Sequence, residues 1–146
     1  MSTEGSSAKA PAPARVEARG SETILIADDH ESMREIARQT LLNLGYHVLS
    51  ACDGEEALRL CKREAPSLAI LDVVMPKLGG KATASPLTAL FADLPILFTS
   101  GYSQDSEDVT PAMAGARYLQ KPYSPTTLGR VVRGMLDQAK SRKGAS

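Results

Sequence analysis

The chain has 146 residues, of which 42% are hydrophobic, and its 17 lysines and arginines balance its 17 acidic residues. This length allows one domain with a buried core, while a net charge of zero gives no general attraction to nucleic acid or acidic lipid. No apolar run approaches the ~20 residues of a membrane span, and the N-terminus lacks the apolar segment of a secretory signal. We therefore expect a cytoplasmic protein without direct nucleic-acid or membrane partners, in which Cys52 and Cys61 are reduced packing residues.

The two ends of the chain differ in composition from the part between them. Residues 1–20 are rich in Ala, Pro, Ser and Gly and have no apolar periodicity, which predicts a disordered arm. Residues 139–146 form a short basic tail that suits the end of a helix. The range 21–138 is then a single domain without internal repeats. Met1 favours a complete short protein, and a fragment of a longer kinase is the other possibility.

Between these ends, short apolar runs alternate with segments of helical periodicity. This alternation is typical of βα units that build a parallel sheet. The predicted strands are 24–27, 46–51, 68–71, 96–99 and 118–120.

Most of the predicted helices carry a start or stop signal. The first follows an apolar pattern from Met33 to Leu44 and ends at Gly45, and the second opens at Asp53-Gly54 with acids in its first turn. In the third, 81–91, Pro86 either kinks the helix or starts a new one with Ser85 as N-cap.

Two more helices are expected towards the C-terminus. A polar, loosely patterned helix is predicted around Glu107 to Met113, and Ser124-Pro125 starts the last helix. The apolar stripe of this last helix consists of Leu128, Val131, Val132, Met135 and Leu136.

Reactive side chains follow four of the predicted strands. Asp28 and Asp29 follow the first strand, Asp72 the third, Ser100 the fourth and Lys121 the fifth. The carboxyl ends of parallel strands meet at one edge of a sheet, where open α/β folds place their chemistry. Three carboxylates that lie close together need a cation to remain ionised, and their oxygens suit Mg²⁺. With a hydroxyl and an ammonium group, they predict a site for metal-assisted phosphoryl transfer.

Several short motifs occur here in a set order. They are the acidic pair, Asp72-Val73-Val74-Met75-Pro76 with Gly80 behind it, Thr99-Ser100-Gly101, and Lys121-Pro122. Together they resemble the receiver domain (response regulator, CheY-like) of bacterial two-component systems, roughly from Ser21 to Gln138. The resemblance implies a flavodoxin-like (βα)5 fold of the α/β class, a doubly wound parallel sheet with strand order 2-1-3-4-5. The run Leu94–Tyr102 resembles the receivers of hybrid histidine kinases more than those of DNA-binding regulators.

The resemblance also implies roles for individual residues. Asp72 would be the phosphoacceptor, with a histidine kinase or histidine phosphotransfer protein as donor and Mg²⁺ as cofactor. Asp29, Asp72 and the carbonyl of Val74 would bind the metal directly, and Asp28 would hold a metal-bound water. Lys121, aimed inward by a cis bond to the next proline, would supply a second positive charge.

Ser100 and Tyr118 would report the phosphorylated state. Their shift would remodel the face made by the helix around Glu107 to Met113, strand 118–120 and the last helix, where a downstream protein would bind. Val74 and Tyr102 would act as modulators that make the phosphorylated state long-lived, since valine cannot orient a water for hydrolysis and a tyrosine ring can cover its approach. The alternative is that Tyr102 points into solvent and shields nothing. Such a protein is not an enzyme beyond its own aspartyl phosphorylation and dephosphorylation.

Each motif also has an ordinary structural interpretation. An acidic pair commonly caps a helix, Lys121 alone resembles a solvated lysine, and Tyr118 alone resembles a core aromatic. His30, beside the acids, would at most tune the metal site. For the whole chain, the alternative is a protein-interaction module on a receiver fold that is never phosphorylated. Degenerate receivers usually lose an acid or the lysine, and this chain has all of them.

The motifs argue against two enzyme classes. A Rossmann dehydrogenase needs a glycine-rich turn after the first strand, where this chain has Ala27-Asp28-Asp29-His30. A haloacid-dehalogenase-type phosphatase would carry a second aspartate at the position of Val74. Both classes are therefore set aside.

Overall fold

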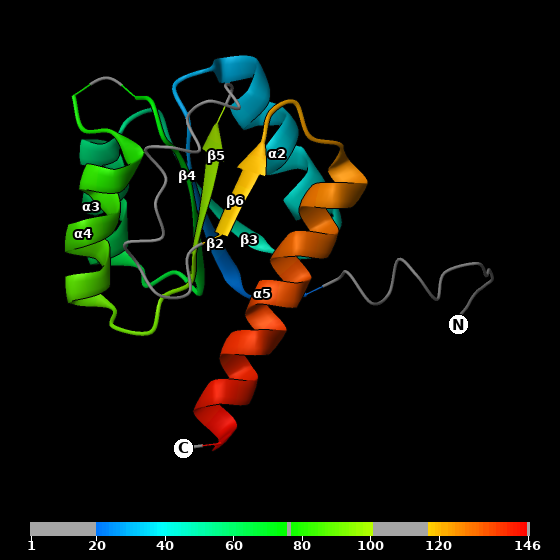
Figure 1. Ribbon diagram of the computed structural model, residues 1–146. Helices are drawn as coiled ribbons and strands as arrows, with labels where there is room; N and C mark the ends of the chain where they lie inside the picture. The colour runs from blue at the N-terminus through cyan, green and yellow to red at the C-terminus, as the bar shows by residue number, and fades with distance from the viewer. Residues whose placement is uncertain (1–19, 76, 101–116, 146) are drawn as a thin grey trace.

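The computed structural model describes residues 20–75, 77–100 and 117–145, in which five strands alternate with four helices (Figure 1). In chain order the elements are β2 (Thr23–Ala27), α2 (Glu31–Asn43), β3 (His47–Ala51), α3 (Gly54–Arg63), β4 (Leu68–Asp72), α4 (Gly80–Leu90), β5 (Ile96–Ser100), β6 (Arg117–Gln120) and α5 (Pro125–Ala145). The predicted boundaries of these elements agree to within one or two residues, apart from the end of α5, which continues to Ala145 and takes in most of the tail predicted at 139–146. The helix expected around Glu107 to Met113 lies outside the described residues.

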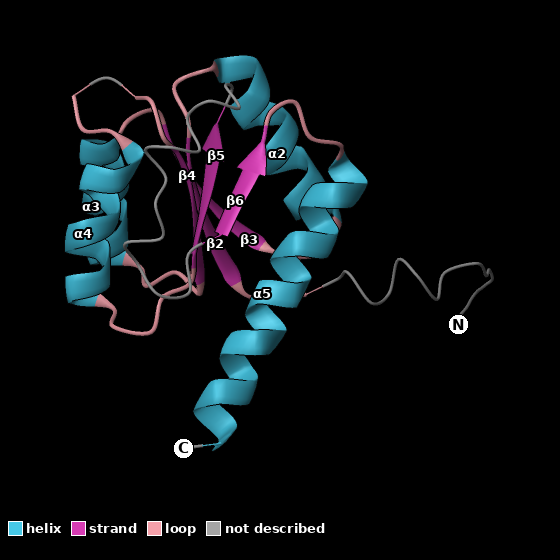
Figure 2. Ribbon diagram, in the orientation of Figure 1, coloured by secondary structure: helices cyan, strands magenta, loops and turns pink. Residues whose placement is uncertain are grey.

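The five strands form one parallel sheet in the order β3-β2-β4-β5-β6. Counted along the chain, this is the predicted order 2-1-3-4-5. Ala27 at the end of β2 pairs with Ala51 of β3 and with Leu71 of β4, so the carboxyl ends of these strands are level. Helices α2 and α5 cover one face of the sheet, and α3 and α4 cover the other (Figure 2).

The sheet divides the hydrophobic core into two parts. Along β2, Leu25 and Ala27 face the α3–α4 side, while Ile24 and Ile26 face the α2–α5 side. All residues of β4 are buried, as expected for a central strand covered on both faces. A fully buried leucine or isoleucine contributes about 1.5–3 kcal/mol. In the described part of the chain, no helix is both long and apolar enough to cross a bilayer.

The capping signals act as the sequence indicates. Gly45 adopts a φ of 100°, and the amides of Gly45 and Tyr46 donate to the carbonyls of Leu42 and Leu41, which is a Schellman motif. The side chain of Asp53 accepts a hydrogen bond of 2.8 Å from the Glu56 amide at the start of α3. Ser124 accepts from the Thr127 amide at 3.1 Å before α5.

Two local predictions need correction. Helix α4 runs through Pro86, so the alternative in which a new helix begins at Ser85 is wrong. The buried face of α4, which includes Ala84 and Leu87, offsets the roughly 3 kcal/mol that an interior proline costs. Cys61 is buried and packs in the core as predicted, but Cys52 is exposed and is not a packing residue.

A cluster of polar side chains joins the N-terminal end of the sheet to α5. Arg133 of α5 pairs with Glu22 at 2.8 Å and with Asp137 at 2.9 Å, and it donates to the Tyr46 hydroxyl at 3.2 Å. We call Glu22, Tyr46, Arg133 and Asp137 the Arg133 cluster. The amide of Gly20, the first described residue, donates to the Leu44 carbonyl nearby at 3.0 Å.

Candidate functional site

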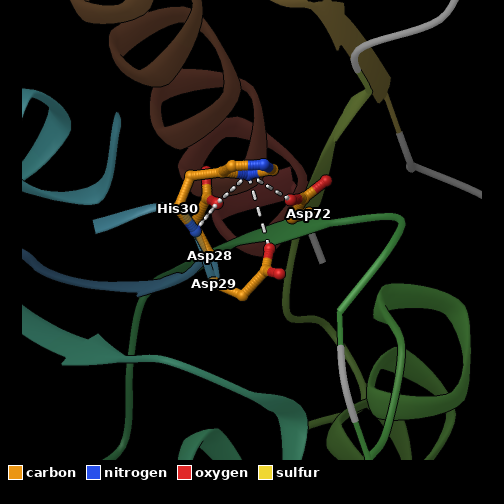
Figure 3. A group of neighbouring side chains, drawn as sticks. All are labelled: Asp28, Asp29, His30 and Asp72. Carbon is orange, nitrogen blue, oxygen red and sulfur yellow. Dashed lines mark hydrogen bonds and ion pairs between the residues drawn. The ribbon is translucent and has the colours of Figure 1, made fainter. Parts of the chain in front are cut away.

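The predicted reactive residues meet at the carboxyl edge of the sheet. Asp28 and Asp29 follow β2, Asp72 is the last residue of β4, and Lys121 follows β6. The side chains of Asp28 and Asp72 are 4% and 3% exposed, so both carboxylates are buried. With His30 beside them (Figure 3), these residues form what we call the acidic site.

Lys121 joins two of the three carboxylates. Its Nζ lies 2.9 Å from Asp28 Oδ2 and 3.0 Å from Asp72 Oδ2, and its side chain is only 10% exposed. Burial by itself lowers the pKa of Lys121, but the hydrogen bonds and charges of Asp28 and Asp72 raise that pKa overall. The side chain is therefore an ammonium group held inside the site and not a solvated surface lysine. The peptide bond between Lys121 and Pro122 is cis, as the resemblance implies.

Asp72 is under opposing influences. Burial raises its pKa, the hydrogen bond from Lys121 counteracts that effect, and the charge of Asp28 raises the pKa further, so the net direction is upward. The Val74 amide donates to Asp72 Oδ1 at 3.4 Å. Ionised Asp72 therefore needs more positive charge than Lys121 alone provides.

The loop after β2 holds the acidic pair in place. Asp28 Oδ1 accepts a hydrogen bond of 2.9 Å from the His30 amide, and the Asp28 carbonyl accepts one of 2.7 Å from Arg34. The N-cap of α2 is His30, without a side-chain capping bond, so the helix-capping interpretation of Asp29 is wrong. The Asp29 side chain is 33% exposed and is the most accessible of the three acids.

The donor set of the acidic site fits a divalent cation. One oxygen or nitrogen from each of Asp28, Asp29, His30 and Asp72 lies within 4.8 Å of the others. In the described part of the chain, Lys121 is the only lysine or arginine that forms an ion pair with these acids. Three carboxylates against one ammonium leave excess negative charge, and carboxylate oxygens are the ligands that Mg²⁺ and similar hard cations prefer.

The predicted switch residues lie on β5 and β6. The Tyr118 ring stacks on Phe98, with centroids 5.2 Å apart and planes at 18°, so this side chain is a half-buried packing residue in the state described. Ser100 ends β5, and its carbonyl accepts a hydrogen bond of 2.7 Å from the Lys121 amide. Val74 is 62% exposed beside the site. Tyr102 lies outside the described residues.

Two further residues shape the site, and the sequence pattern did not reveal their roles. A Cβ on Gly80 would collide with the carbonyl oxygen of Asp72, so a glycine is needed where α4 approaches the end of β4. The motif marks Gly80 but does not reveal this contact. Burial and the charges of Asp28 and Asp72 raise the pKa of Tyr123 to about 12. Only its position two residues after Lys121 could have indicated that Tyr123 lies near the acids.

Comparisons with known proteins agree with this geometry. Residues 24–133 match the family model of the response regulator receiver domain. The probable transcriptional regulator ycf27 of Porphyridium aerugineum is 42% identical over 116 residues, which cover 79% of this chain and 48% of that protein. The alkaline phosphatase synthesis transcriptional regulatory protein PhoP of Bacillus subtilis (strain 168) is 36% identical over 114 residues, or 77% of this chain and 48% of that protein. The chain therefore spans about half the length of the curated relatives it matches.

Solved structures show the same fold. A CheY-like receiver domain protein from Methanospirillum hungatei JF-1 has a TM-score of 0.77 and 27% identity, covering 84% of this chain and 99% of that one. NtrX from Brucella abortus, solved with ADP, has a TM-score of 0.80 and 25% identity, covering 86% of this chain and 29% of that one. These matches confirm the predicted fold class. The likeness of Leu94–Tyr102 to hybrid-kinase receivers stays a prediction.

Proposed function

The chain belongs to the response regulator receiver domain family, and from this premise we propose that Asp72 is its phosphoacceptor in a two-component or phosphorelay pathway. The observation that carries the proposal is the buried Asp72 carboxylate with the Lys121 ammonium 3.0 Å away. A buried nucleophile beside a fixed positive charge suits phosphoryl transfer, which depends mainly on positioning and charge stabilisation.

In the proposed reaction, a carboxylate oxygen of Asp72 attacks the phosphorus of a phosphohistidine. A phosphorus–oxygen bond forms, the phosphorus–nitrogen bond breaks, and its electron pair leaves with the imidazole of the donor. Lys121 stabilises negative charge on the phosphoryl oxygens. Mg²⁺, held by Asp29, Asp72 and the Val74 carbonyl, with Asp28 acting through a water, would supply further positive charge.

The donor would be a histidine kinase or a histidine phosphotransfer protein. Receiver domains interact with histidine kinases and downstream effectors and are not conventional enzymes. For this chain, we propose that Ser100 and Tyr118 respond to the phosphoryl group and change the face that includes β6 and α5. The backbone bond from Lys121 to Ser100 supports this coupling, because it ties the end of β5 to the lysine that would contact the phosphoryl group.

Intact-mass spectrometry after incubation with acetyl phosphate tests the proposal. Wild type should gain the mass of one phosphoryl group with Mg²⁺ present, whereas Asp72→Asn should gain none and EDTA should strongly reduce the yield. Asp93→Asn, which changes an exposed aspartate away from the site, is the control and should behave as wild type. An equal gain in the Asp72→Asn variant would refute the assignment. No gain in wild type would favour an interaction module that is never phosphorylated.

A further inference from the structure

A buried hydroxyl group next to the acidic site has no hydrogen-bond partner. Among the described residues, five polar side chains are buried: Asp28, Asp53, Asp72, Thr83 and Thr99. The first four have hydrogen bonds. The hydroxyl of Thr99, which is 1% exposed, makes none within the described part of the chain. A buried hydroxyl without a partner disfavours folding, and a valine would fill the same space, so packing does not explain this threonine.

The register of the sheet places Thr99 beside the proposed phosphoacceptor. Thr99 of β5 pairs with Asp72 of β4 (Figure 1), and neighbouring strands lie about 4.8 Å apart. The preceding pair in this register, Leu71 and Phe98, packs on the α3–α4 side of the sheet. Because side chains alternate along a strand, those of Asp72 and Thr99 both point to the α2–α5 side. A rotation about the Cα–Cβ bond of Thr99 can therefore turn its hydroxyl towards the Asp72 carboxyl group.

Both oxygens of Asp72 already have donors in the unphosphorylated protein. The Lys121 ammonium lies 3.0 Å from Oδ2, and the Val74 amide donates to Oδ1 at 3.4 Å. In an aspartyl phosphate, one of these oxygens would carry the phosphoryl group, and Lys121 would contact a phosphoryl oxygen instead. The carboxyl group would then lose its charged donor, and the neighbouring Thr99 hydroxyl, which has no other partner in the described chain, can replace it.

We propose that Thr99 is a catalytic residue for loss of the phosphoryl group, because its hydroxyl donates to the Asp72 carboxyl oxygen in the phosphorylated state. The inference rests on the proposed function, since it requires phosphorylation of Asp72. In hydrolysis, a water oxygen attacks the phosphorus and forms a new phosphorus–oxygen bond. The bond from phosphorus to Asp72 breaks, and its electron pair returns to Asp72, which leaves as a carboxylate. The protons of the water remain with the released phosphate.

The hydrogen bond from Thr99 strengthens as this reaction proceeds. Its acceptor begins as the carbonyl oxygen of an acyl phosphate and ends as an oxygen of an ionised carboxylate. Hydrogen bonds to ionised acceptors are about twice as strong as those between neutral groups. Thr99 therefore stabilises the transition state more than it stabilises the phosphorylated protein, and such a difference in binding increases the rate. Return of the phosphoryl group to a histidine gains in the same way, because Asp72 is again the leaving group.

Two substitutions at Thr99 test this inference in the full chain. Thr99→Val removes the hydroxyl and keeps the shape of the side chain, whereas Thr99→Ser keeps the hydroxyl. After phosphorylation with acetyl phosphate and removal of the excess, the phosphorylated mass should decay about three- to tenfold more slowly in Thr99→Val than in wild type. Thr99→Ser should decay at nearly the wild-type rate. Thr88→Val is the matched control and should also decay as wild type, because the Thr88 hydroxyl donates to the Ala84 carbonyl within α4 at 3.1 Å.

Urea denaturation of the unphosphorylated protein separates a catalytic role of Thr99 from a structural one. Because its hydroxyl has no partner in the described chain, Thr99→Val should be at least as stable as wild type. Thr83→Val should be less stable, since it removes a buried hydroxyl that donates to the Gly79 carbonyl at 2.7 Å. Unchanged or faster decay in Thr99→Val would overturn the inference, as would equally slow decay in Thr99→Ser. Slower decay together with a loss of stability in Thr99→Val would also overturn it, because the hydroxyl would then serve the fold.

The same measurements separate this inference from the proposed function. If wild type and both Thr99 variants gain a phosphoryl group and lose it at one rate, the phosphoacceptor assignment stands and only the role of Thr99 is wrong. If wild type gains no phosphoryl group, phosphorylation of Asp72 and the role of Thr99 are both refuted.

Discussion

The two ends of the parallel sheet each hold a group of ionised side chains, and the two groups are balanced differently. In the Arg133 cluster, one guanidinium bonds to both oxygens of Glu22, to the Tyr46 hydroxyl and to Asp137. In the acidic site, one ammonium faces three carboxylates and pairs with only two of them, Asp28 and Asp72. Protein atoms therefore compensate the charge of Arg133, whereas negative charge in the acidic site remains without a protein partner of opposite sign.

This difference also appears in the direction of the pKa shifts. The hydrogen bonding that Arg133 donates to Glu22 is the main influence that raises the pKa of Arg133, so the cluster favours the charged form of that side chain. Burial is the main influence that raises the pKa of Asp72, so the acidic site disfavours its charged form. Buried charges stabilise a fold only when they are well compensated. We conclude that the Arg133 cluster serves stability, while the acidic site keeps uncompensated charge for a cation and a phosphoryl group.

Breaking the Arg133 cluster should produce the largest change in stability. Arg133→Met leaves Glu22, which is 14% exposed, without its main charge partner. Because an uncompensated, largely buried charge is costly, the free energy of unfolding should fall by about 2–4 kcal/mol. Urea denaturation measures this loss, and phosphorylation of the folded variant at low temperature should be unchanged.

Arg130→Met is the control for the cluster, since Arg130 is an exposed arginine on the same helix. It should change the free energy of unfolding by less than about 0.5 kcal/mol. A loss in Arg133→Met no larger than that in Arg130→Met would show that the cluster does not stabilise the fold.

The acidic site should respond in the opposite direction. Without divalent metal at pH 7, Asp72→Asn should raise the free energy of unfolding by on the order of 1 kcal/mol, because it removes a charge that burial disfavours while Lys121 keeps Asp28 as partner. A folded-state pKa raised above the unfolded value of ~3.9 means that wild type loses stability as the pH rises through the folded pKa. The gain in Asp72→Asn should therefore disappear towards pH 3.

Asp93→Asn, at an exposed position, should show no such gain or pH dependence. A destabilised Asp72→Asn would mean that the ion pair with Lys121 outweighs the cost of burying Asp72. The acidic site would then resemble the Arg133 cluster, and the contrast between the two ends of the sheet would be lost.

The two ends of the sheet were not equally predictable from the sequence. The residues of the acidic site stand directly after apolar runs, and parallel topology brings such positions together, so local pattern was sufficient for Asp28, Asp72 and Lys121. The Arg133 cluster was missed because Glu22, Tyr46 and Arg133 come from three distant segments, and no local pattern relates them. Its charges look like ordinary surface charges in the sequence.

Side-chain packing explains the other differences between prediction and structure. The sequence gives the cost of Pro86 in a helix but not the burial of Ala84 and Leu87 that offsets it. Similarly, His30 appears as an ordinary residue until its ring is placed against the three acids. Helix caps such as Gly45 were predicted correctly, because a cap depends on neighbours in the sequence.

Substitutions at Val74 and Tyr102 should have a moderate effect on the lifetime of a phosphoryl group on Asp72. Val74 is 62% exposed, and its amide donates to Asp72 Oδ1, so its side chain stands beside the reacting carboxylate without a group that orients water. Replacing Val74 with Asn and Tyr102 with Glu should speed loss of the phosphoryl group several-fold in excess Mg²⁺, as measured by the decay of the phosphorylated mass. Val74→Leu is the matched control and should leave the decay unchanged. If the double variant decays at the wild-type rate or more slowly, these positions do not protect the phosphoryl group.

Deleting the N-terminal arm should have the smallest effect on the free energy of unfolding. The residue at which the deletion stops decides whether Glu22 of the Arg133 cluster is kept. Removing residues 2–19 keeps Gly20, whose amide bonds to the Leu44 carbonyl, and Glu22, which pairs with Arg133. A segment rich in Ala, Pro and Ser buries little apolar surface, so the free energy of unfolding should change by less than about 0.5 kcal/mol. Removing residues 2–22 eliminates Glu22 and should reduce stability nearly as much as Arg133→Met. Equal stability of the two truncated proteins would show that Glu22 contributes little. A large loss of stability on removal of residues 2–19 alone would show that the arm itself packs on the domain.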